Sequence, residues 1–180
     1  MTELSYRPAV AAEAGSVAAL INSAYRGESS RAGWTTEADF LVGLRTDEDE
    51  IRDLIGHDGS VILLCERADE IIGCVHLRRD GDSAYLGMFV VRPDLQGAGI
   101  GKRFMAAAED LVRREWDARR ITMTVLSLRD ELIAFYERRG YRRTGRFTPF
   151  PADSRSTPMV QDLRFETLEK DLPAAPQPAR

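Results

Sequence analysis

RPDLQGAGIGKRFMAAAEDLV, residues Arg92–Val112, is a glycine-rich turn followed by an apolar stripe with helical spacing. Three glycines, Gly97, Gly99 and Gly101, alternate with other residues where the helix is expected to begin. The first turn of a helix has free backbone N–H groups and the positive end of the helix dipole, and both attract anions. Because glycine lets a ligand approach the backbone closely, the stretch predicts a phosphate-binding turn.

Two common phosphate-binding motifs are excluded by their spacing. A phosphate loop requires G-x-x-x-x-G-K-[ST], but Gln96 stands in place of its first glycine and Arg103 in place of its hydroxyl residue. A dinucleotide-binding turn requires G-x-G-x-x-G, and its third glycine would fall at Lys102. The spacing that remains is Q-x-x-G-x-G, from Gln96 to Gly101.

The composition is that of an ordinary globular domain. The chain has 180 residues, of which 43% are hydrophobic and 30% are charged, and this suits a single domain. A net charge of −4 argues against a general nucleic-acid-binding protein, which usually has a basic face. No apolar run is long enough to span a membrane and the N-terminus has no signal pattern, so we expect a cytoplasmic protein. Cys65 and Cys74 lie in apolar runs and are expected to be buried, reduced thiols.

Hydrophobic periodicity predicts a mixed α/β chain with hairpins at both ends and a strand–helix–strand unit in the middle. Strands are expected at Leu4–Ala9, Ser60–Arg67, Glu70–Arg79, Ser83–Val91, Arg120–Ser127, Tyr141–Gly145 and Gln161–Lys170. Helices are expected at Ala11–Tyr25, at Thr35–Gly56 as one broken or two short helices, at Ile100–Glu115 and at Arg129–Gly140. Segment 26–34 is expected to be a turn and segment 146–159 a proline-rich loop. Residues 171–180 are expected to form a disordered tail.

Two motifs carry a resemblance to a known family. The Q-x-x-G-x-G turn directly after a strand that ends VVRP resembles the acyl-CoA-binding motif of the GNAT superfamily of N-acetyltransferases. The stretch LIAFYERRGYRRTG, residues 132–145, resembles that family's second motif, in which a helix carries a tyrosine and ends in glycine and an aromatic residue. The order of elements is similar over residues 4–170. The resemblance implies one domain, residues 1–170, with the GNAT fold: a central, mostly antiparallel mixed sheet with a splayed parallel strand pair, flanked by helices.

The resemblance also implies acetyl-CoA as the co-substrate. The turn would bind its pyrophosphate, and the splayed strand would bind its pantetheine by backbone hydrogen bonds, as a strand edge binds a peptide. The implied cofactor-binding residues are Phe89, Val90, Val91, Gln96, Gly97, Ala98, Gly99, Ile100, Gly101, Lys102 and Tyr136. Where relatives often have an asparagine, this chain has Arg129, which is expected either to contact a cofactor phosphate or to lie in solvent.

Acetyl transfer to an amine needs an acid for the departing sulfur and a base for the amine. Tyr136 lies at the family's tyrosine position, and a phenol with an ordinary pKa of about 10 can protonate a thiolate. The strand Tyr85–Val91 has no carboxylate, where many relatives hold one. The base is therefore open between Glu37, Glu28, His76 and a chain of water molecules, and the sequence favours water. The alternation around His76 indicates a structural histidine rather than a base.

The acceptor site is implied to lie between segments 25–37 and 147–159, which correspond to variable regions in relatives. We expect Tyr25, Arg31, Trp34 and Phe150 to contact the acceptor. This mixture of aromatic and charged side chains suits a small amino-acid-like or aromatic amine. A polyamine would require more carboxylates.

The sequence therefore predicts a transferase, an N-acetyltransferase that moves the acetyl group of acetyl-CoA directly to the primary amine of a small molecule. Two alternatives stay open: a peptide or protein N-acetyltransferase, and a non-catalytic acyl-CoA-binding regulatory module. No His, Cys and Asp cluster has metal-ligand spacing, so no metal is expected. Neither nucleic acid nor a membrane is expected as a partner, and a homodimer is left open.

Overall fold

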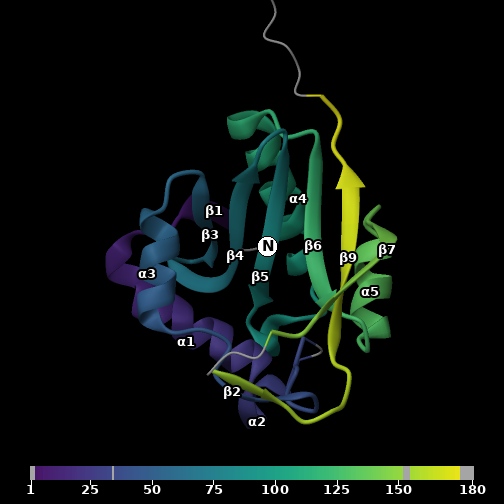
Figure 1. Ribbon diagram of the computed structural model, residues 1–180. Helices are drawn as coiled ribbons and strands as arrows, with labels where there is room; N and C mark the ends of the chain where they lie inside the picture. The colour runs from purple at the N-terminus through teal and green to yellow at the C-terminus, as the bar shows by residue number, and fades with distance from the viewer. Residues whose placement is uncertain (1–2, 34, 152–154, 175–180) are drawn as a thin grey trace, which may run out of the picture.

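In the computed structural model, which describes residues 3–33, 35–151 and 155–174, a seven-stranded sheet has the order β1-β3-β4-β5-β6-β9-β7 (Figure 1). Its strands are β1 (Leu4–Pro8), β3 (Ser60–Arg67), β4 (Glu70–Asp80), β5 (Ser83–Val91), β6 (Arg120–Leu126), β7 (Arg142–Pro149) and β9 (Arg164–Asp171). All neighbouring strands are antiparallel except β5 and β6, which are parallel. The prediction of a mostly antiparallel mixed sheet with one parallel pair is confirmed.

Helices cover both faces of this sheet (Figure 1). α1 (Ala14–Tyr25) and α3 (Glu48–Gly56) pack against one face, and α4 (Ile100–Trp116) and α5 (Asp130–Glu137) pack against the other. The apolar residues of α4 recur every three or four positions and therefore form one buried stripe. This packing fixes the start of α4, and with it the glycine turn, beside the end of β5. No helix in the described part of the chain is long and apolar enough to cross a membrane.

β5 and β6 pair at one end only. Residues 83–85 are matched with residues 120–122, and the described residues form no further pair between these two strands. Farther along β5, Met88 has a φ of 48°, in the left-handed region, and the register against β4 shifts at this point. A bulge of this kind bends a strand and increases its twist. The two parallel strands therefore diverge, and one edge of β5 is open toward the gap.

Residues 35–43 do not form the helix that the sequence predicted. They make a turn followed by β2 (Leu41–Gly43), which pairs with β8 (Ser156–Pro158) in a separate two-stranded sheet. The backbone of this segment bonds to a distant element instead of along a helix, since the N–H of Glu37 donates to the carbonyl of Tyr25 at 2.9 Å. The prediction was wrong here because the partners of the segment are remote in sequence.

Other local predictions were partly changed. Segment 146–159 is more regular than the loop expected there, because β7 extends into it and β8 lies inside it. The turn expected at 26–34 contains one helical turn, α2 (Gly27–Ser30). The second helix expected before residue 56 is confirmed as α3, and the Asp47 side chain caps it by accepting the N–H of Glu50 at 2.8 Å.

The C-terminal segment 171–180 is described only in part. Asp171 is the last residue of β9, and the N–H of Leu172 donates to the carbonyl of Arg119 at 2.9 Å. Leu172 is buried in the core between the sheet and α4, so the first residues of the expected tail pack on the domain. Residues 175–180 lie outside the described part of the chain. Cys65 and Cys74 are buried and free, as predicted.

His76 on β4 is buried, and its Nε2 lies 3.0 Å from the hydroxyl oxygen of Ser60. Burial, together with the positive charges of Arg78 and Arg45, lowers the pKa of His76 to about 4. An unfolded chain binds a proton at this histidine below about pH 6.5 and the native protein does not, so the free energy of unfolding should fall by roughly 2 to 3 kcal/mol between pH 6.5 and pH 4.

His76→Gln keeps a polar group beside Ser60 and should remove this part of the acid destabilisation. Urea unfolding at pH 7 and pH 4.5 measures the difference. The assignment is contradicted if the wild type and the variant lose the same free energy of unfolding between the two pH values.

Candidate active site

The glycine-rich turn lies between β5 and α4, after the short helical turn η2 (Pro93–Leu95). Gly97 and Gly99 have φ values of 87° and 74°, a conformation that favours glycine. None of the backbone N–H groups from Gly97 to Lys102 donates to another described residue. Since a helix N-terminus with unpaired N–H donors attracts anions, the backbone of this turn is suited to bind phosphate.

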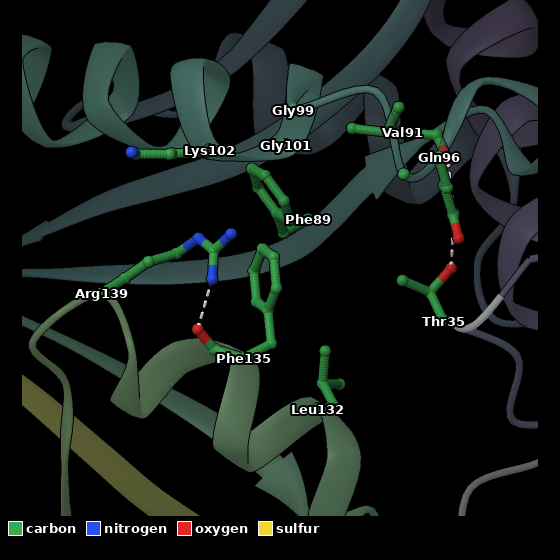
Figure 2. A pocket seen from close by; sticks show the side chains of 11 residues that line it. Thr35, Phe89, Val91, Gln96, Gly99, Gly101, Lys102, Leu132, Phe135 and Arg139 are labelled. Atoms are coloured by element: carbon green, nitrogen blue, oxygen red, sulfur yellow. Dashed lines mark hydrogen bonds between the residues drawn. The ribbon is translucent and has the colours of Figure 1, made fainter.

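A cavity of about 280 Å³, here called the cofactor cavity, lies against this turn (Figure 2). It brings together most of the predicted cofactor-binding residues: Phe89, Val91, Gln96, Gly97, Gly99, Gly101 and Lys102. Its other lining residues are Thr35, Leu132, Phe135 and Arg139, which the sequence analysis did not assign to it. Figure 2 shows Lys102 and Arg139 toward one end of the cavity, and Gln96 and Thr35 toward the other. The cavity thus combines two cations with an apolar middle.

The space around Gly101 shows whether a phosphate-bearing ligand would fit in the cofactor cavity. A Cβ at this position would lie 3.7 Å from the Phe135 ring and 3.8 Å from the Phe89 ring. A larger side chain would therefore fill the space between the turn and these two aromatic walls. The bare backbone, the unpaired N–H donors and the two cations fit such a ligand.

Arg139 is a cation of the cofactor cavity that follows α5. Its guanidinium lies 3.3 Å from the centre of the Phe135 ring, and its Nη1 donates to the Phe135 carbonyl at 2.6 Å. Burial lowers the pKa of Arg139. Because the ordinary pKa of a guanidinium is far above 7, the group stays charged at neutral pH. In the sequence its only signal was the cluster of arginines at a helix end, which is common and not specific.

A small space of about 40 Å³, here called the junction, lies where β5 and β6 diverge. Tyr136 of α5 lines it, together with Tyr25 and Glu37. The Tyr136 hydroxyl makes no hydrogen bond with another described residue, and burial raises the pKa of this phenol. The Tyr25 hydroxyl donates to the carbonyl of Phe89 on β5 at 3.1 Å. Tyr136 is therefore a protonated phenol that is free to donate to a ligand at the junction.

A third cavity of about 220 Å³, here called the acceptor cavity, lies beyond the junction. Its lining includes four aromatic side chains: Tyr25, Tyr85, Phe150 and Phe165. Its charged lining residues are Arg26, Glu37 and Arg45. Arg26 Nη1 and Glu37 Oε2 are 2.5 Å apart, and both side chains are largely buried. Among the described residues, no group of three or more His, Cys, Asp or Glu side chains could hold a metal ion.

The structure places some predicted residues away from these cavities. Glu28 and Arg31 form an exposed ion pair at 3.0 Å, and neither lines a cavity of the site. Val90 and Ile100 are buried in the core, and Ala98 is exposed on the turn. Tyr25, Glu37, Phe150 and Tyr136 do line the junction or the acceptor cavity, while Trp34 lies outside the described residues.

Arg129 immediately precedes α5 and is buried rather than solvated. Its Nη1 donates to the carbonyl of Thr35 at 2.8 Å, and Thr35 Oγ1 accepts from the side-chain amide of Gln96 at 3.1 Å. The positive charge of Arg129 opposes the rise that burial causes in the pKa of Tyr136 and of Tyr25. Arg129 therefore ties segment 35–37 to α5 and lies near both phenols of the junction.

The fold and the cavities agree with one protein family. The model of the acetyltransferase (GNAT) family matches residues 17–141, more than half of the chain. This chain belongs to the GNAT acetyltransferase family, and membership implies acyltransferase activity. No curated protein sequence matches it.

Solved structures show the same fold. Ribosomal-protein-S18-alanine N-acetyltransferase from Escherichia coli has a TM-score of 0.71 and 10% identity, with 99% of each chain covered. A GNAT-family acetyltransferase from Streptococcus pneumoniae has a TM-score of 0.67 and 18% identity, covering 95% of this chain and 100% of that one. Mutant forms of the spermidine/spermine N-acetyltransferase from Vibrio cholerae have a TM-score of 0.65 and 17% identity, covering 94% of this chain and 95% of that one. At such identities the likeness shows the fold alone.

Proposed function

We propose that the protein transfers the acetyl group of acetyl-CoA to the primary amine of a small molecule by direct attack on the thioester. The observation that carries this proposal is the continuity of the three cavities. Phe89 and Leu132 line both the cofactor cavity and the junction. Tyr25 and Glu37 line both the junction and the acceptor cavity. A route therefore leads from the glycine turn, past Tyr136, to a pocket that contains a carboxylate.

Acetyl-CoA would supply the activated acetyl group, and this chain would hold its other parts. The unpaired N–H groups of residues 97–102, with Lys102 and Arg139, would bind its phosphates. The edge of β5 at Phe89–Val91, which β6 leaves unpaired, would bind the amide chain of the pantetheine as an added strand would be bound. The carbonyls of Phe89 and Val91 already accept hydrogen bonds from the Tyr25 hydroxyl and the Gln96 side-chain amide. These roles are supported by the unpaired donors and by the lining of the cofactor cavity.

The transfer forms a C–N bond and breaks a C–S bond, while the amine loses one proton and the sulfur gains one. Tyr136 would donate the proton to the sulfur, because its hydroxyl has no partner among the described residues and burial raises its pKa. Glu37 is the one carboxylate among the described residues that line the acceptor cavity and the junction. Its second oxygen has no hydrogen-bond partner there, so it would accept the amine proton, directly or through a water molecule. The geometry thus favours Glu37 over the water route that the sequence favoured.

Two glycine substitutions test the binding of acetyl-CoA. Gly101→Val should fill the cofactor cavity, and Gly99→Val should distort a turn that needs a φ of 74°. A ligand that binds only the native state raises the melting temperature. We therefore expect acetyl-CoA to raise the melting temperature of the wild type but of neither variant.

Gly81→Val is the matched control, because Gly81 also has a positive φ of 61° but lies in the β4–β5 hairpin, outside the cavities. It should lose stability and keep the full shift with acetyl-CoA. A full shift in both Gly99→Val and Gly101→Val would contradict phosphate binding by this turn.

The activity itself is tested by a library of amines with acetyl-CoA, in which free thiol is followed and acetylated products are identified by mass. Acetylation of a small amine supports the proposal. Acetylation of peptides alone would favour a peptide or protein acetyltransferase. Tight binding of acetyl-CoA without acetylation of any amine would favour a regulatory module.

The cytoplasmic location stays a prediction.

A further inference from the structure

The charges of the acceptor cavity are unbalanced. Arg26 and Glu37 are bonded to each other, and Arg26 Nη2 also donates to the hydroxyl of Ser156 at 3.2 Å. The remaining charged group of the lining is the half-buried guanidinium of Arg45, which forms no ion pair with any described residue. A cavity lined by two arginines and one glutamate attracts an anion.

Arg45 is held in place by one turn of α1. Its backbone N–H donates to the side-chain oxygen of Asn22 at 2.7 Å, and the Asn22 amide donates to the carbonyl of Thr46 at 2.9 Å. Its guanidinium lies over the Tyr25 ring, 5.9 Å from the ring centre. Tyr25 is itself fixed by the hydrogen bond of its hydroxyl to the Phe89 carbonyl. The backbone that carries Arg45 is therefore fixed beside the cavity before any ligand binds, and its guanidinium lies over the Tyr25 ring.

We propose that Arg45 binds a carboxylate of the acceptor, so that the acceptor is an amino acid with an apolar or aromatic side chain. This inference rests on the proposed function and names the substrate class of the same site. A guanidinium binds a carboxylate through two parallel hydrogen bonds, which gives both affinity and orientation. Arg45 and Glu37 line the same cavity, so with the carboxylate at Arg45 the amine of the same molecule would lie toward the part that Glu37 shares with the junction.

The rest of the lining agrees with this class of acceptor. The ring centres of Phe150 and Phe165 are 5.5 Å apart, and Tyr85 also lines the cavity. These surfaces suit an apolar or aromatic side chain. The volume of about 220 Å³ suits a small molecule. A polyamine would bring several positive charges to a lining in which the only carboxylate, among the described residues, is already paired with Arg26.

Matched pairs of amines test the proposal: phenylalanine and phenethylamine, tyrosine and tyramine, tryptophan and tryptamine, leucine and 3-methylbutylamine. Within a pair the two compounds differ only in the carboxylate. Acetylation is followed by thiol release, and binding is measured separately by calorimetry with CoA present. We expect the wild type to bind and acetylate the amino acid of at least one pair better than its decarboxylated partner.

Arg45→Met should lower kcat/KM for that amino acid by about 30-fold or more, because truncating one partner of a hydrogen-bonded charge pair typically costs at least this factor. It should change kcat/KM for the decarboxylated amine much less, so that the preference for the amino acid is lost, and Arg45→Lys should restore part of that preference. Arg78→Met is the matched control. Arg78 is exposed and lies over the Tyr85 ring at 5.2 Å from its centre, so this change removes a nearby charge outside the acceptor cavity. The preference for the carboxylate should survive it.

The outcomes separate this inference from the proposed function. Equal acetylation of both members of every pair, with no effect of Arg45→Met, overturns the carboxylate subsite and leaves the acetyltransferase intact. Binding of an amino acid that depends on Arg45, without acetylation of any amine, supports the subsite and overturns the proposed function. If no amino acid binds or reacts, the carboxylate subsite is wrong.

Discussion

Tyr136→Phe is expected to lower kcat by about 10- to 1000-fold, while acetyl-CoA still binds. The substitution removes one hydroxyl and little volume. The centre of the Tyr136 ring lies 5.4 Å from that of Phe135 and 5.8 Å from that of Tyr141. The loss follows because the departing sulfur would have no phenol to protonate it. Steady-state release of thiol with an accepted amine measures kcat, and the thermal shift with acetyl-CoA measures binding.

Tyr141→Phe is the matched control for loss of a buried phenol. The Tyr141 hydroxyl donates to the Glu109 carboxylate at 3.0 Å, and Tyr141 lines none of the three cavities. We expect this variant to lose stability and to keep kcat.

The wild type should keep kcat up to about pH 10, because burial raises the pKa of Tyr136 above that ordinary value for a phenol. An unchanged kcat in Tyr136→Phe would mean that water protonates the sulfur.

The cofactor side of the site could be predicted from sequence because its signals are local. The glycines, the strand before them and the apolar stripe of α4 lie within one continuous stretch, and each requires only its neighbours in sequence. The splayed strands were expected from the resemblance alone, since no local pattern shows that pairing stops after residue 85. Arg139 was missed because its position in the cavity depends on how α5 packs beside α4.

The acceptor side could not be predicted in the same way, because its contacts join distant parts of the chain. Arg26 bonds to Glu37 and to Ser156, and β2 pairs with β8 more than a hundred residues later. These contacts replaced the helix expected at residues 35–43. Arg45 had no signal in the sequence beyond its charge, and its role depends on α1 holding it beside the cavity.

Glu37→Gln is expected to lower kcat/KM by about 100- to 10,000-fold, the range for loss of a general base. An aliphatic amine with a pKa near 10 is almost wholly protonated at pH 7, so a group must accept its proton before attack. Glutamine has nearly the same size as glutamate and can still accept a hydrogen bond from Arg26, but it cannot take up the proton. Because the substitution leaves the buried Arg26 without its counter-ion, the melting temperature and the acetyl-CoA shift must be measured beside the kinetics.

The pH dependence of kcat/KM decides between Glu37 and the water route. In Glu37→Gln the reactive amine arises only by its own ionisation, so kcat/KM should rise about tenfold per pH unit up to the pKa of the amine. In the wild type the carboxylate removes the proton within the complex, so the rise should be shallower and the two proteins should converge at high pH. Glu28→Gln is the matched control, because Glu28 is an exposed carboxylate paired with Arg31 and should behave as wild type. If Glu37→Gln also matches the wild type across the whole profile, water alone removes the proton and Glu37 serves only to hold Arg26.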